Sequence, residues 1–347
     1  MPSAPGARRR AVRLRWWSGR VSRRTTVLTV VAAALVLALA VGAMMLGDYP
    51  LSPTEVLVTV AGGGSDQEAF IVRTLRLPRV LVGAGVGVAL AVSGSIFQGL
   101  VRNPLVAPDV IGVMAGATVA AVTAIVVFQS TAIVPVAAFV GAVLATFVIY
   151  GLTWRQGVAG GRLVLVGVGL EFVLTALTTL VIVRFPVEQV TPAIVWMTGT
   201  LYGAAWSDVV WLAGALAVLL PAALALMPRL QRLQLGDELA TALGVALEPS
   251  RAGLLAVGAG LAATAVAVAG PVKFVALMIP HVARLLAGPL TGGVLVLAGM
   301  LGAVLVVGSD LVAQHAFSPT SLPAGIVTAA IGAPYFLFLL HRVNRHA

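Results

Sequence analysis

Long uninterrupted runs of apolar residues recur along the whole chain, and they constrain its fold more than any other feature. The first run, 26–46, contains no charged residue. A helix needs about 20 predominantly apolar residues to cross the hydrocarbon core of a bilayer. The strands of a transmembrane barrel alternate apolar and polar residues, and these runs do not. The sequence therefore predicts an all-α, polytopic membrane protein.

Composition excludes the soluble alternatives. Of the 347 residues, 60% are apolar and 10% are charged, and the mean hydropathy is +1.05. Soluble domains carry about 25% charged residues, and even a 300-residue domain buries only about 75% of its surface. A soluble enzyme, a disordered chain and a nucleic-acid-binding domain are all inconsistent with these values.

The runs predict ten spans with short connections. An amphipathic surface segment (52–61) and a Gly-rich polar loop follow the first span, and a broken, Pro-containing segment (184–202) with a half-helix follows the fifth. The predicted spans are 26–46, 80–100, 110–128, 132–152, 163–183, 208–227, 252–269, 274–286, 293–312 and 322–340.

Charge distribution predicts the topology. With both termini in the cytoplasm, 17 basic residues lie inside and five lie outside, as the positive-inside rule requires. Eight of them lie between Arg8 and Arg24, a tail that would also attract anionic lipid. Residues 22–28 loosely resemble a twin-arginine export signal, but the run after them is too long for a signal peptide. The net charge of +10 is thus a topology signal, and nucleic acid is not an expected partner.

The predicted organisation is an Arg-rich cytoplasmic tail (1–24), a transmembrane domain (25–341) with a cytoplasmic loop at 228–251, and a short C-terminal tail (342–347). Segments 81–85 and 256–260 are similar and predict an inverted repeat whose Gly-rich helices lie inside the bundle; chance likeness between such helices is the alternative. The chain has no cysteine, and His281 is interpreted as a helix-end residue. We therefore expect no metal site, no cofactor and no catalytic residues.

The loop segment 236–245 has the features of a short capped helix. Asp237 and Glu238 begin it, where the positive end of a helix favours carboxylates, and Gly244 ends it in the position of a C-cap glycine. Leu239, Ala240 and Leu243 are expected to share one face, at i, i+1 and i+4. A helix of about two turns is unstable alone and needs a groove to lie in. That groove belongs either to a partner or to the chain's own bundle. No phosphate-binding loop of the GxxxxGK[ST] type occurs, so ATP would be hydrolysed by another subunit.

Five motifs in the expected order resemble the FecCD/BtuC-type permeases, the membrane subunits of ATP-binding cassette (ABC) importers for iron–siderophore, haem and cobalamin. The resemblance covers nearly the whole chain after residue 70. The motifs are 76–79 (RLPR), 91–98 with 102–109 (AVSGSIFQ, RNPLVAPD), 236–244 (GDELATALG), 273–284 (KFVALMIPHVAR) and 322–328 with 332–336 (LPAGIVT, GAPYF).

The resemblance implies a dimer with an identical or paralogous permease, two cytoplasmic ATPases, an external binding protein and a bacterial plasma-membrane location. The ATPase-coupling residues would be Gly236, Asp237, Glu238, Leu239, Ala240, Leu243 and Gly244. Arg76 and Arg79 would meet carboxylates of the binding protein, although lipid headgroups are an alternative. Gln314 stands where the family often has a third docking arginine.

Glu171 is a second departure from the family pattern, since it is a carboxylate in the middle of the fifth span. A charge at that depth costs about 3 kcal/mol, so it should face a wet path or a partner. Thr175 and Thr178 continue its helical face. The resemblance places this stripe on the translocation pathway, and Gln98 is assigned there too. A protonated Glu171, hydrogen-bonded within the bundle, is the alternative.

The leading functional hypothesis is a non-enzymatic permease of an ABC importer that carries a bulky chelate, with ferric siderophore as the expected cargo. Haem and cobalamin remain alternatives. A proton-coupled secondary transporter that uses Glu171 is the rival from another class, but such proteins usually hold several intramembrane charges.

Overall fold

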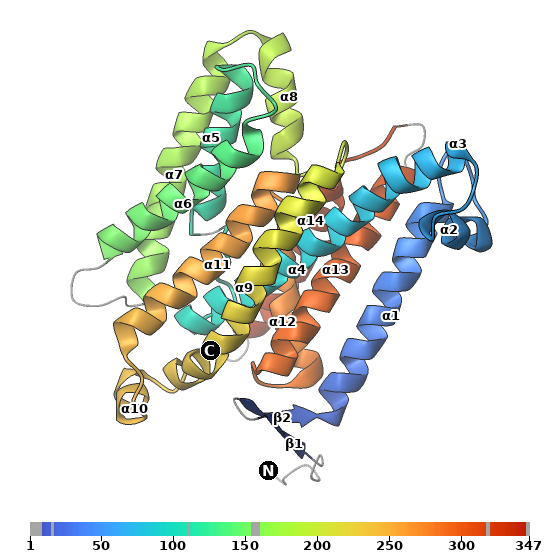
Figure 1. Ribbon diagram of the computed structural model, residues 1–347. Helices are drawn as coiled ribbons and strands as arrows, with labels where there is room; N and C mark the ends of the chain where they lie inside the picture. Colours follow the sequence, from blue (N-terminus) through green and yellow to red (C-terminus); the bar gives the residue numbers. More distant parts are fainter. Residues whose placement is uncertain (1–8, 15–16, 110, 154–159, 317–319, 345–347) are drawn as a thin grey trace.

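The computed structural model describes residues 9–14, 17–109, 111–153, 160–316 and 320–344 (Figure 1). The elements are β1 (Arg9–Leu14), β2 (Trp17–Ser22), α1 (Arg23–Met45), α2 (Pro53–Val60), α3 (Asp66–Ala69), the π-helix η1 (Phe70–Arg76), α4 (Leu77–Val101), α5 (Val113–Val126), α6 (Val134–Thr153), α7 (Gly160–Arg184), α8 (Val187–Met197), α9 (Trp206–Leu233), α10 (Asp237–Ala242), α11 (Leu247–Ala269), α12 (Val275–Ala287), α13 (Gly292–His315) and α14 (Ala324–Asn344). We call the end of the bundle that carries α10 the inner end, and the end that carries α2 and α3 the outer end.

The helices occupy the predicted spans. Within the described residues, seven are long and apolar enough to cross a membrane, and the apolar helices α5, α12 and α14 are shorter. The surface segment is α2 and the half-helix is α8, both as predicted. The chain is thus a multi-pass helical membrane protein, while ten complete crossings with both termini inside stay a prediction.

Two Gly- and Ala-rich helices form the centre of the bundle. Of the span windows of α4 and α11, 78% and 72% are buried, against 11% for α1, α7 and α9. Small side chains let them approach closely, and the Ser93 hydroxyl of α4 donates to the Gly258 carbonyl of α11 at 2.6 Å. Segments 81–85 and 256–260 lie inside the bundle for the most part, as predicted, with Leu81 and Ala256 exposed.

Helix lengths repeat in the two halves of the chain. Helices α4 to α7 have 25, 14, 20 and 25 residues, and α11 to α14 have 23, 13, 24 and 21. Each short second helix follows a residue in the left-handed region, Gly112 before α5 and Phe274 before α12. Helices α4 and α11 run in opposite directions (Figure 1). These features support the predicted inverted repeat.

Short non-helical segments lie in the interior of the bundle, after α8, after α11 and before α14. The Thr200 N–H donates to the Ala269 carbonyl at 2.8 Å, and the Gly325 N–H donates to the Gly199 carbonyl at 2.9 Å. Irregular backbone is tolerated at membrane depth only where protein groups satisfy it. These bonds join the start of α14 to the loops that follow α8 and α11.

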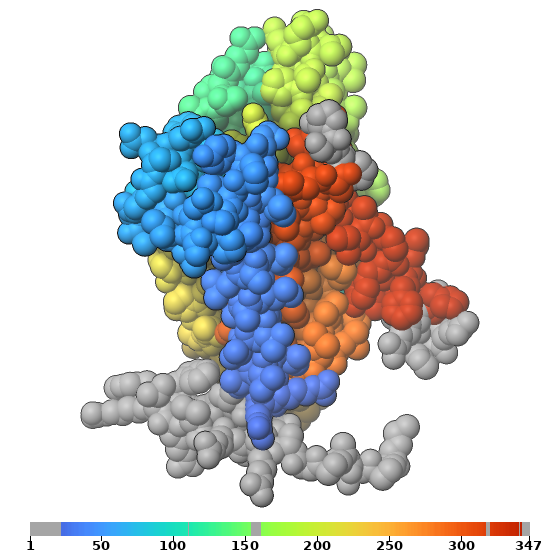
Figure 2. All heavy atoms as spheres, turned by 90° about the vertical axis from the view of Figure 1, so that its right-hand side faces the viewer, coloured from blue at the N-terminus to red at the C-terminus, as the bar shows by residue number. Residues whose placement is uncertain are grey.

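The chain ends differ from the prediction in two ways. Part of the predicted Arg-rich tail forms an antiparallel hairpin of β1 and β2, with Arg9 opposite Ser22 and Leu14 opposite Trp17. The all-α class therefore holds for the membrane domain, not for this hairpin. At the other end α14 extends to Asn344, past the predicted boundary at 341, and 345–347 lie outside the described residues. Figure 2 shows α1 lying along α13, with the α2–α3 segment at its outer end.

Candidate functional site

The short helix α10 presents an apolar stripe at the inner end of the bundle. Leu239 and Leu243, with Leu235 just before the helix, are 57%, 53% and 56% exposed, whereas Ala240 is fully buried. Leu239 and Leu243 lie four apart and so on one face of α10, which points away from the bundle, while Leu235 is exposed in the turn before the helix and Ala240 packs against the bundle. The expectation that Ala240 shares the face of Leu239 and Leu243 is wrong.

Backbone geometry and one arginine hold α10 in place. Gly244 has a φ of +76°, a left-handed conformation that residues with a Cβ rarely adopt, so it turns the chain sharply after the helix. Arg251 of α11 donates to both carboxylate oxygens of Asp237 at 2.7 and 2.8 Å and to Glu248 at 3.3 Å. Because Arg251 is only 11% exposed, this clamp fixes α10 to α11. The Glu238 carboxylate stays on the exposed surface.

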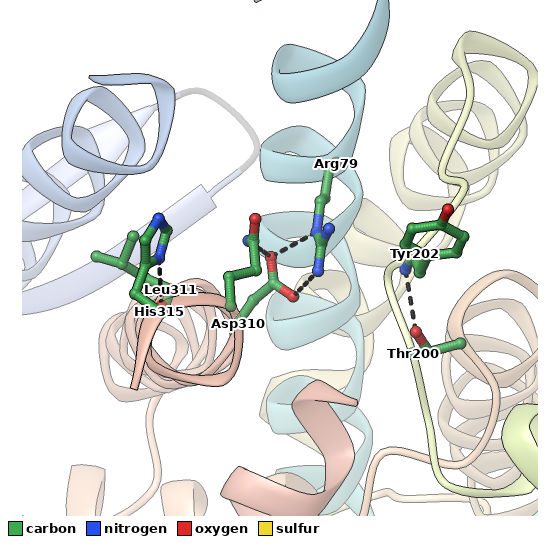
Figure 3. Close-up of polar contacts among 7 residues, drawn as sticks. Arg79, Thr200, Tyr202, Asp310, Leu311 and His315 are labelled. Atoms are coloured by element: carbon green, nitrogen blue, oxygen red, sulfur yellow. Dashed lines mark hydrogen bonds and ion pairs between the residues drawn. The ribbon is translucent and has the colours of Figure 1, made fainter. Parts of the chain in front are cut away.

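The second candidate site is a buried ion pair at the outer end. The Arg79 guanidinium on α4 donates to both oxygens of Asp310 on α13 at 2.8 Å (Figure 3). The side chains are 18% and 6% exposed. The Gln314 amide also donates to Asp310, at 2.8 Å. Arg79 and Gln314 therefore bind the same carboxylate, and two N–H groups of the Arg79 guanidinium are already used within the subunit.

The other outer arginines also bind internal groups. Arg76 donates to the Met44 carbonyl at 2.6 Å and to the Tyr49 carbonyl at 2.8 Å. It thus satisfies a carbonyl in the last turn of α1, which has no partner within the helix, and one in the loop that follows. Arg73 donates at 2.6 Å to the carbonyl of Thr59, which lies at the C-terminal end of α2. Basic residues at this end thus have a structural reason that the sequence did not reveal: they join α1, α2 and α13 to the η1–α4 segment.

Gln98 lies in a closed contact between helices. Its side chain is 3% exposed, its amide donates to the Leu277 carbonyl at 2.9 Å, and it accepts a hydrogen bond from Arg284 at 2.6 Å. Within the subunit Gln98 therefore joins α4 to α12, and its place on the translocation pathway stays a prediction. Arg284 is a functional candidate that sequence reasoning missed. His281, one helical turn before Arg284 on α12, packs edge-on against Tyr335, with ring centroids 6.2 Å apart.

Glu171 lies half-buried on α7 beside the start of α5. It lies against Gly112, and its carboxylate is within electrostatic reach of Asp109 and Lys273. Its Oε2 atom is buried and has no hydrogen-bond partner among the described residues. Thr175 is exposed, and Thr178 is 4% exposed and donates to its own helix. The predicted stripe therefore divides: Thr175 faces outward, and Thr178 faces inward.

Sequence comparison then decides the family. Residues 28–342 match the profile of the FecCD transport family. The chain belongs to the FecCD transport family. The first 27 residues, including both strands of the β1–β2 hairpin, lie outside this match.

Named relatives of this FecCD-family chain are permease subunits. The achromobactin transport permease CbrC of Dickeya dadantii is 41% identical over 338 residues, covering 95% of this chain and 97% of CbrC. The ferric enterobactin permease FepG of Escherichia coli is 35% identical, covering 94% and 98%. The cobalamin permease BtuC of Halobacterium salinarum is 39% identical, covering 80% and 75%.

A solved structure supports the same assignment. A metal-chelate type ABC transporter in an inward-facing conformation matches with a TM-score of 0.82 and 27% identity, covering 91% of this chain and 99% of that one. This FecCD-family chain is therefore a multi-pass transport permease of the bacterial cytoplasmic membrane.

Proposed function

We propose that the chain is the membrane subunit of an ABC importer and moves a ferric siderophore inward along a path between two permeases. The observation that carries the ABC assignment is the leucine stripe of α10. Three exposed leucines within nine residues of one inner-end loop are unfavourable in water unless a partner covers them. The helix that bears them is clamped by Arg251, so it can transmit force to α11.

The occupant we propose for this stripe is a cytoplasmic ATPase subunit. The double variant Leu239→Asp with Leu243→Asp should abolish co-purification of the ATPase, because two carboxylates would be desolvated in an apolar groove. The matched control, Leu239→Met with Leu243→Met, keeps the apolar surface and should keep the ATPase. Equal ATPase recovery with both double variants would overturn the assignment.

Exposure of α7 supports a second permease as partner. Only 11% of its span window is buried within the subunit, yet it carries Glu171 and Thr175, with Lys273 nearby. A partner permease that packs across α7 would enclose these groups in a polar path. Glu171→Gln keeps the size of the side chain and removes its charge, and we expect it to reduce uptake several-fold while vanadate sensitivity persists.

The rival secondary transporter makes a different prediction. If Glu171 carried the coupling proton, uptake by the reconstituted complex would collapse with the proton gradient and ignore vanadate. ATP-driven import gives the opposite pattern. Because relatives carry siderophores, citrate chelates or cobalamin, we expect competition assays to rank a labelled ferric siderophore above haem and cobalamin. Preferential uptake of haem or cobalamin would refute the proposed cargo and leave the proposed ATP-driven mechanism untouched.

The binding-protein contact stays part of the proposal in altered form. With Arg79 held by Asp310 and Arg76 held by carbonyls, an incoming carboxylate of a binding protein has to share or displace these internal partners. Charge reversal at both arginines should still abolish uptake that depends on the binding protein. Measurement of the permease melting temperature in the same variants separates lost docking from lost folding.

A further inference from the structure

An apolar groove runs along the side of the bundle, away from α10 and from α7. It has a volume of about 750 Å³ and is lined by α6, α9 and α11, with Phe139 and Tyr150 from α6, Trp211 and Leu219 from α9, and Ala256 and Gly260 from α11 among its walls. Phe139 and Trp211 pack edge to face there, with ring centroids 5.8 Å apart.

The groove offers almost nothing to water. Besides the Tyr150 hydroxyl and the Trp211 indole N–H, its lining holds two polar side chains, both threonines. Thr146 donates to the Ala142 carbonyl at 2.8 Å, and Thr264 donates to the Gly260 carbonyl at 2.7 Å. A buried water needs two to four polar partners, and these hydroxyls are already used by their own helices. An aqueous path or a polar ligand is therefore a poor fit, and an apolar ligand is a good one.

Its length matches one leaflet of a bilayer. From Phe139 to Tyr150 the groove follows α6 for 11 residues, which is about 16 Å at 1.5 Å per residue. Half of a hydrocarbon core of about 30 Å is about 15 Å. The neighbouring α6 side chains Leu144 and Phe147 are 58% and 67% exposed, so this face of the bundle is open to the membrane.

A cation lies beyond the inner end of the groove. Arg229 follows Trp211 by 18 residues on α9, which is five full turns, so it lies on the side of the helix that lines the groove. One turn before Arg229, Leu226 still faces α11, 3.6 Å from where a Cβ on Gly253 would be. Arg229 is exposed, and no described carboxylate forms an ion pair with it.

We propose that this groove binds one phospholipid of the inner-end leaflet, with an acyl chain along α6, α9 and α11 and its phosphate at Arg229. The apolar walls, the one-leaflet length and the exposed guanidinium at one end together match an amphiphile with an anionic head. A bare hydrocarbon would leave Arg229 without a partner, and a soluble anion would leave the groove empty. The site goes beyond the proposed function, because no residue of α7 or α10 and none of the outer arginines lines it.

Native mass spectrometry of the permease in mild detergent tests the proposal. We expect the wild-type chain to retain one phospholipid. Ala256→Trp fills the groove and should lower the retained fraction at least tenfold. Val218→Trp adds the same ring at a 69% exposed position of α9 outside the groove lining and should retain the lipid. Arg229→Gln should release it at a several-fold lower detergent concentration.

Two results would overturn the proposal. The first is equal lipid retention in Ala256→Trp and Val218→Trp. The second is unchanged retention in Ala256→Trp with loss of the permease dimer, which would make the groove a contact between copies of the chain. If Ala256→Trp does not fold, Ala215→Phe fills the groove from α9 instead. Added phosphatidylglycerol should raise the melting temperature of the wild-type chain and leave that of the groove-filled variant unchanged.

Discussion

The crossing of α4 and α13 gives the sharpest test of the packing. Gly87 and Gly302 face each other there, and a Cβ on either would meet the carbonyl oxygen of the other. A Cβ on Gly87 would also lie 2.7 Å from the Ala303 nitrogen, whereas ordinary contact begins at 3.4 Å. Gly87→Ala therefore has to open the crossing by about 1 Å, which forfeits a quarter to a half of each neighbouring van der Waals contact.

The net cost of Gly87→Ala follows from two opposing terms. Overpacking costs about 1–3 kcal/mol, and the better helix propensity of alanine returns up to about 1 kcal/mol. The net cost of up to about 2 kcal/mol should lower the melting temperature by up to about 3 °C, because the entropy of unfolding is about 2.1 cal/mol/K per residue and the chain has 347 residues.

Thermal unfolding of the purified permease, followed by tryptophan fluorescence, measures the effect. Gly42→Ala on α1 is the control, because nothing lies within 4 Å of its added Cβ, and it should melt at or slightly above the wild-type temperature. Gly302→Ala should behave like Gly87→Ala, and the double variant should cost less than the sum, because the first opening makes room for the second methyl. A Gly87→Ala variant that melts with Gly42→Ala would refute the reasoning.

Three further predictions concern polar contacts. Asp310→Asn leaves the mostly buried Arg79 without its counter-charge and should destabilise the permease by about 3 kcal/mol; the thermal scan measures it, and the apolar pair Arg79→Met with Asp310→Leu should regain most of the loss. Arg251→Gln releases α10 from α11, so hydrogen exchange of the α10 amides should accelerate at least tenfold while α11 stays protected, and unchanged exchange would show that the clamp is dispensable. Hydrogen bonds from Ser52 lower the pKa of Glu55, so its cap on α2 is complete above the unfolded pKa of about 4.3 and is lost as the pH falls through the lower folded value. Protection factors of the α2 amides, which are exchange rates divided into the intrinsic rate at the same pH, should then be smaller at pH 3 than at pH 6, and Glu55→Gln should remove this difference.

Sequence reasoning located the spans well for a physical reason. A run such as 26–46 must be removed from water, and its length alone selects a membrane helix. The loop helix at 236–244 was also found, since its acidic start and its Gly244 end are local signals. Both depend on residues adjacent in the chain.

Contacts between distant segments were out of reach. Arg79 and Asp310 are 231 residues apart, and Gln98 and Arg284 are 186 apart. Nothing local marks them as partners, so the arginine was interpreted as a free docking group and the glutamine as a pathway residue. The faces of α10 were also misjudged at Ala240, because a short helix does not reveal which side its own bundle covers.

The pairing of the outer arginines also bears on how fast a partner arrives. Between 46 and 79 the chain carries three arginines and the acidic residues Asp48, Glu55, Asp66 and Glu68, so this surface has no excess positive charge. Fields from such mixed charges fade within a Debye length of about 8 Å at physiological salt. The capture rate of a binding protein should therefore change little with ionic strength, and fit between the surfaces, rather than attraction from a distance, would select the partner.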